Sequence, residues 1–162
     1  MKRAIIILCV TLCFISCSKS KVEKANKLIA EQELGVSPIS TLDSLNYYKD
    51  CLELRIKAAS ITHEADSTLK AGVKQADEMV TNGQARYVKS YAENLRDNCV
   101  AMYRIAYKYK QDANYGVMRH TLAKEPKEFL GFQCVVSNDS LTYRVAFDKD
   151  VSKILLIEKE KK

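Results

Sequence analysis

The chain has 162 residues, of which 47% are hydrophobic and 28% are charged, a balance typical of a single globular domain. Only 5 glycines and 2 prolines are present. These are too few for a many-stranded sandwich, a collagen or a flexible low-complexity chain, so the composition favours long helices. The formal net charge of +6 is too small to indicate a nucleic-acid partner, and none is expected.

The N-terminus has the pattern of an export signal. Two basic residues at the start are followed by an apolar run from Ala4 to Ile15, which is too short to cross a bilayer, because a span needs ~20 helical residues. Ser16 and Cys17 follow the run. This order of charge, apolar run, small residue and cysteine resembles the lipobox of bacterial lipoproteins, although Phe14 stands where that family usually has an aliphatic residue.

The resemblance implies that residues 1–16 are a signal peptide and that Cys17 receives the lipid that attaches the protein to a membrane. Two or more acyl chains, at ~0.8 kcal/mol per buried methylene, give stable attachment. Residues 17–21 would then be a short tether and residues 22–162 a single folded domain. In this family, Ser18 in place of Asp implies the outer membrane, and a tether without an acidic cluster favours the periplasmic face over the cell surface.

Removal of the signal changes the charge and the cysteine count. The net charge falls to +4, because the signal contains two basic residues, Lys2 and Arg3, and no acidic residue. Cys51, Cys99 and Cys134 remain, and their wide separations match no zinc-finger pattern. They are interpreted either as small buried apolar residues or as one disulfide and one thiol.

Four amphipathic segments are predicted from apolar residues recurring at helical spacing. The first begins with the capping-box pair Ser20 and Glu23, and the third ends at Asn82 and Gly83, a strong stop signal. Breaks are expected at residues 62–64 and 114–116. The predicted helical ranges are 22–34, 45–59, 65–80 and about 84–113.

After Pro126 the hydrophobic period changes to two, which predicts strands at 130–136, 141–147 and 154–157. The expected fold class is therefore α+β: an antiparallel helical bundle followed by a C-terminal three-stranded antiparallel β-meander, with helices covering the apolar face of the strands. This layout is loosely similar to small uncharacterised lipoproteins of some Gram-negative anaerobes, a resemblance that implies no functional residues.

No catalytic motif is present in the sequence. His63 and Glu64 begin like a zinc-protease helix, but Ser67 stands where the second histidine is required. His63 and His120 are interpreted as surface or turn histidines, and we expect no catalytic residue, no metal site and no cofactor.

Tyrosines are dense on the longest predicted helix. Tyr87 with Tyr91, and Tyr103 with Tyr107, form pairs four residues apart, and Arg104 lies among them. Tyrosine and arginine are typical of contact surfaces, so these five residues are candidates for binding a partner. The alternative is that the rings pack on neighbouring elements.

These features predict a lipid-anchored envelope protein that is a non-catalytic binding module, with another envelope protein or a glycan as its partner. The alternative is a small envelope hydrolase with a carboxylate site, because the 20 acidic residues offer many pairs of carboxylates.

Overall fold

The computed structural model describes residues 20–160 and confirms the α+β class. The chain divides into two compact units. The sheet unit contains residues 20–47 and 127–160, and the helical hairpin contains residues 48–126.

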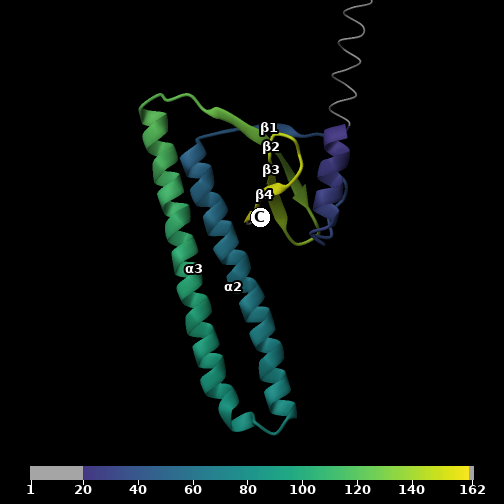
Figure 1. Ribbon diagram of the computed structural model, residues 1–162, viewed down its shortest axis with the longest axis vertical. Helices are drawn as coiled ribbons and strands as arrows, with labels where there is room; N and C mark the ends of the chain where they lie inside the picture. Colours follow the sequence, from purple (N-terminus) through teal and green to yellow (C-terminus); the bar gives the residue numbers. More distant parts are fainter. Residues whose placement is uncertain (1–19, 161–162) are drawn as a thin grey trace, which may run out of the picture. The chain divides into compact units, whose positions relative to one another are not determined.

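The sheet unit is built on four antiparallel strands, β1 (Asp43–Tyr47), β2 (Glu128–Ser137), β3 (Thr142–Phe147) and β4 (Ile154–Glu160). They are arranged in the order β1-β2-β3-β4 (Figure 1). The prediction of three strands was wrong because β1 lies 80 residues before β2 in the chain and belongs to a segment predicted to be helical.

The helical prediction for the β1 segment rested on Leu45 and Tyr48, whose spacing also fits a helix. Ser44 and Asn46, however, are weak helix formers, and the segment pairs with β2 instead. Long-range strand pairing satisfies the backbone polar groups of this segment, and that contribution outweighs a weak local preference.

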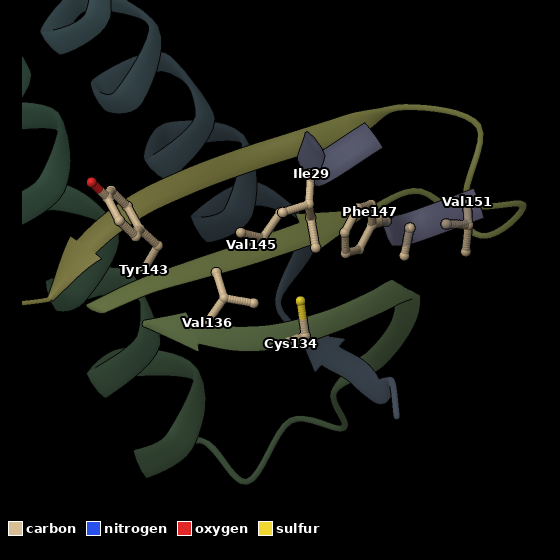
Figure 2. Packing of buried hydrophobic residues seen from close by; sticks show 8 residues of the cluster. Ile29, Cys134, Val136, Tyr143, Val145, Phe147 and Val151 are labelled. Carbon is tan, nitrogen blue, oxygen red and sulfur yellow. The ribbon is translucent and has the colours of Figure 1, made fainter. Parts of the chain in front are cut away.

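The three strands predicted after Pro126 are present as β2, β3 and β4, and their apolar residues share a face as the alternation predicts. Cys134 pairs with Val145 and Val136 with Tyr143, and their side chains gather on one face with Phe147 (Figure 2). The helix of residues 20–30 covers this face with its buried residues Ala25 and Ile29. The first predicted helix therefore packs on the sheet, and the expected bundle is reduced to a hairpin of the two long helices.

The turn between β3 and β4 places an apolar side chain in this core. Val151 has a φ of 52°, which costs a β-branched residue conformational energy, yet its side chain is buried. The Asp148 carboxylate accepts hydrogen bonds from the Ser152 and Lys153 amides. These bonds stabilise the turn in the conformation that buries Val151.

The helical hairpin consists of α2 (Lys49–Thr81) and α3 (Ala85–Leu122), which lie side by side (Figure 1). Both predicted breaks are absent. Thr62 donates its hydroxyl to the Ala58 carbonyl at 2.9 Å, which accommodates the polar residue inside the helix. The chain also remains helical through Gly116. Because glycine has no side chain, Cys51 of α2 packs directly against the α3 backbone at this position.

The two helices meet through small residues rather than large ones. Seven of the small buried residues recur at every seventh position along their helix, which is the heptad spacing of a coiled coil. Leu69, Val73 and Val80 recur at helical spacing, which predicts that they share a buried stripe. They are exposed instead, because close approach of the backbones at the small residues leaves larger side chains at the flanks. The buried small residues are Cys51, Ala58, Ala65 and Gly72 on α2, and Cys99, Ala106, Ala113 and Gly116 on α3.

Candidate functional site

Cys17, the predicted lipid-attachment residue, lies outside the described residues, as does the whole predicted signal peptide. The other three cysteines are described. Cys51, Cys99 and Cys134 are free and buried, which confirms their interpretation as small core residues.

All five candidate binding residues lie on α3, but two of them are engaged within the hairpin. Tyr91 donates its hydroxyl to Gln75 Oε1 at 2.8 Å, and Tyr103 donates to Asp66 Oδ1 at 2.6 Å. Both acceptors lie on α2. The hydrogen bond to Asp66 raises the pKa of Tyr103 to about 12, so its hydroxyl stays protonated and Tyr91 and Tyr103 join the two helices.

Tyr87, Arg104 and Tyr107 are exposed. The Arg86 guanidinium lies 4.7 Å from the ring centroid of Tyr87. At 100° per residue, Tyr87 and Tyr107 lie about 160° apart around the helix. The five candidates therefore do not form a single surface, and only Arg104 and Tyr107 remain close together on the exposed side.

A row of exposed apolar side chains extends from Val100 toward the end of α3. The side chain of Leu122 is 76% exposed and that of Tyr107 is 63% exposed. Single exposed apolar residues are ordinary, whereas several on one helix face indicate a contact surface. The row follows helical spacing, and we call it the outer stripe: Val100, Tyr107, Tyr115, Met118 and Leu122.

The outer stripe lies in a positively charged stretch of α3. Between residues 100 and 124 the single acidic residue is Asp112. Positive side chains on a surface attract acidic surfaces, and such charges contribute more to association rate and selectivity than to affinity. The exposed basic residues of this stretch are Arg104, Lys108, Lys110, Arg119 and Lys124.

A second cluster surrounds His120, where the start of α2 meets the end of α3. His120 Nε2 lies 2.9 Å from Asp50 Oδ2, and Nδ1 lies 2.6 Å from Glu125 Oε2. The Tyr48 ring stacks on the imidazole with centroids 4.6 Å apart and an interplanar angle of 24°. The imidazole is thus fixed by one ring and two carboxylates.

The charges in this cluster are complementary. The hydrogen bonds to Asp50 and then to Glu125 raise the pKa of His120, because both ring nitrogens donate to carboxylates only in the imidazolium form. The bond to His120 in turn lowers the pKa of Asp50. The His120 side chain is only 14% exposed and contacts three other members of the cluster. The interpretation of His120 as a surface or turn histidine did not predict these contacts.

Cys51 lies beside the histidine cluster. Burial and the neighbouring Asp50 carboxylate raise the pKa of the Cys51 thiol to about 11, so the thiol is protonated near neutral pH and is not an activated nucleophile. Its Sγ occupies the space left by Gly116, where an added Cβ would lie 2.7 Å from the sulfur.

Sequence reasoning missed this cluster because its members are far apart in the chain. Asp50 and His120 are separated by 70 residues, and no local motif marks either of them. Only the pairing of the start of one helix with the end of the other, which the hairpin topology dictates, brings them together.

Comparison with protein families, characterised proteins and solved structures finds no match to this chain. Within residues 20–160, no helix has both the length and the apolar character needed to span a membrane.

Proposed function

We propose that this protein is a lipid-anchored cell-envelope protein whose helical hairpin is a non-catalytic binding module. The outer stripe of α3 carries the proposal, since five apolar side chains stand exposed on one face of a helix that packs through small residues elsewhere. The N-terminal pattern ending in Cys17 supports anchoring, and Ser18 supports placement at the periplasmic face of the outer membrane.

The composition of the stripe favours a protein partner over a glycan. Met118 and Leu122 are fully apolar and exposed, and such side chains bind apolar protein surfaces. Arg104 beside Tyr107 adds the pair of residue types most enriched at interface hot spots. The partner is therefore an envelope protein whose contact face is apolar at its centre and acidic at its rim.

The anchor is tested by fatty-acid labelling of the full chain in a Gram-negative bacterium. Wild-type protein should incorporate labelled palmitate and partition into detergent, whereas Cys17→Ala should do neither. Cys13→Ala, which changes a nearby cysteine in the predicted signal, is the matched control and should label normally. Unlabelled wild-type protein, or equal labelling of Cys17→Ala, would contradict lipid attachment.

The contact surface is tested by placing a photo-crosslinking residue at Tyr107 or Met118 in living cells. Lys74, on α2 and 82% exposed, is the control position. Adducts that proteinase digests should form from the two stripe positions and not from Lys74. Adducts that carry sugar and resist proteinase would show that the partner is a glycan and not a protein. An equal pattern of adducts from all three positions would refute the outer stripe as a contact surface.

Stability measurements distinguish a contact surface from a structural role. Tyr107→Ala and Leu122→Ala remove exposed side chains and should each change the free energy of unfolding by no more than ~0.5 kcal/mol. Crosslinking from Met118 should nevertheless fall in both variants. A loss of stability of several kcal/mol would show that the stripe is part of the fold instead.

A further inference from the structure

Three different metal-binding side chains converge at the base of the hairpin. Asp50 and Cys51 are in the first turn of α2, and His120 is in the last turn of α3. One oxygen, one sulfur and one nitrogen from these residues all lie within 4.8 Å of one another. No metal was expected from the sequence, because the residues come from the start of one long helix and the end of the other.

We propose that Asp50, Cys51 and His120 bind a divalent transition-metal ion of the zinc class. Zinc accepts thiolate, imidazole and carboxylate ligands in one site, whereas calcium and magnesium select oxygen ligands. Three protein ligands leave a fourth tetrahedral position for water or for a donor atom of another molecule.

Glu125 and Tyr48 hold the imidazole in the orientation that the site needs. Glu125 Oε2 lies 2.6 Å from His120 Nδ1, so Nδ1 donates to the carboxylate and Nε2 points toward Asp50. Metal-bound histidines nearly always donate their second ring nitrogen in this way. Stacking of the Tyr48 ring limits rotation of the imidazole, so the direction of Nε2 is set before a metal arrives.

The adjustment required between Asp50 and His120 is small. Asp50 Oδ2 and His120 Nε2 are 2.9 Å apart, whereas two ligand atoms of a tetrahedral zinc ion are separated by about 3.3 Å. Asp50 is 54% exposed and is free to move by this amount. Arg119 Nη2, which lies 3.8 Å from Asp50 Oδ2, must turn into solvent, and the exposure of its side chain permits that.

Binding also replaces two protons. His120 Nε2 and Cys51 Sγ each give up a proton to solvent when they coordinate the ion, since only the neutral imidazole and the thiolate are ligands. The buried sulfur then carries its negative charge directly beside a divalent cation, which compensates the desolvation that otherwise keeps the thiol protonated.

The test uses the reduced full chain and Co²⁺ as a spectroscopic probe that occupies zinc sites. Titration should produce a thiolate-to-cobalt charge-transfer absorption that saturates at one ion per chain and disappears when Zn²⁺ is added. Cys51→Ala should abolish the absorption. His120→Gln and Asp50→Asn should weaken Co²⁺ binding at least 10-fold, and Glu125→Gln should weaken it less than either.

Matched controls separate this site from other thiols and histidines. Cys99→Ala changes another buried cysteine of the hairpin, and His63→Gln changes the second histidine. Both should leave the titration unchanged, and circular dichroism should show that every variant remains helical. Absence of the absorption in the wild type, or an absorption that His120→Gln and Asp50→Asn leave unchanged, would overturn the proposal.

Discussion

Gly131 offers a sharp test of how the sheet unit is packed. It lies in β2 opposite Leu45, next to the register shift between β1 and β2, and has a φ of 155°. A Cβ added at Gly131 would lie 2.0 Å from the Phe147 carbonyl oxygen. Because that oxygen belongs to the backbone of the neighbouring strand, no side-chain rotation relieves the contact.

The expected cost of Gly131→Ala has two parts. A backbone conformation that L residues rarely adopt costs ~1–3 kcal/mol, and forcing a methyl group into filled space costs a further ~1–3 kcal/mol. The sum, about 4 kcal/mol, is a large fraction of the ~5–15 kcal/mol by which folded domains are stable. Gly35→Ala is the matched control in the same unit, since Gly35 has a φ of 64° with nothing within 4 Å of an added Cβ. It should lose only ~1 kcal/mol.

Urea denaturation of the two variants and wild type, followed by circular dichroism, measures both free energies of unfolding. Amide hydrogen exchange in β2 and β3 shows whether the loss is located in the sheet. If Gly131→Ala and Gly35→Ala fell within 1 kcal/mol of each other, the close approach of β2 to β3 at this position would be refuted.

Two further predictions concern the hairpin and the β3–β4 turn. Gly72→Ala gains ~1 kcal/mol of helix propensity but places a Cβ 2.3 Å from Leu95 Cδ2, so it should destabilise the protein by ~1 kcal/mol. In a Leu95→Ala background, where the clash is removed, the same substitution should be neutral or stabilising. Equal effects on the free energy of unfolding in both backgrounds, measured by urea denaturation, would contradict the close packing of the helices. Burial raises the pKa of Asp148, but the Ser152 and Lys153 hydrogen bonds outweigh it and lower the pKa below 3.8. The charged carboxylate therefore stabilises the fold above that pH, and the stability advantage of wild type over Asp148→Asn should be constant near neutrality and shrink as the pH falls below 3.8; a pH-independent difference between their unfolding curves would disprove this.

The C-terminal strands were predictable because their signal is local. Alternation of apolar and polar residues fixes which side chains share a face, and a shift of one residue would move every apolar side chain to the other face. Val145 and Phe147, which this alternation places on the apolar face of the strand at 141–147, are fully buried. The β1 strand has only two apolar or aromatic residues, Leu45 and Tyr47, among its five, which is too short a pattern to predict a strand. Its partner β2 lies far along the chain, so no local pattern indicates their pairing.

In the helical hairpin, the spacing of large apolar residues did not predict which side chains are buried. The spacing of large apolar residues predicted two short helices with a break at residues 62–64 where the structure has one long helix. It also placed Leu69 and Val73 on the inside, and Gly72 between them counted against a helix. In the structure Gly72 is buried and its two neighbours are exposed. Hydrophobicity scales rank glycine and alanine low, yet small residues at every seventh position are what allow two helix backbones to approach closely.

The candidate sites also depend partly on local sequence and partly on tertiary contacts. The sequence by itself determined the tyrosine and arginine content of α3, the change of period after Pro126 and the signal pattern ending in Cys17, because each is written in neighbouring residues. Only the tertiary structure decided that Tyr103 bonds to α2 while Tyr107 faces solvent, and that His120 meets Asp50. Those outcomes depend on which helix faces meet and at which register, and the free energy that selects them comes from contacts between residues tens of positions apart.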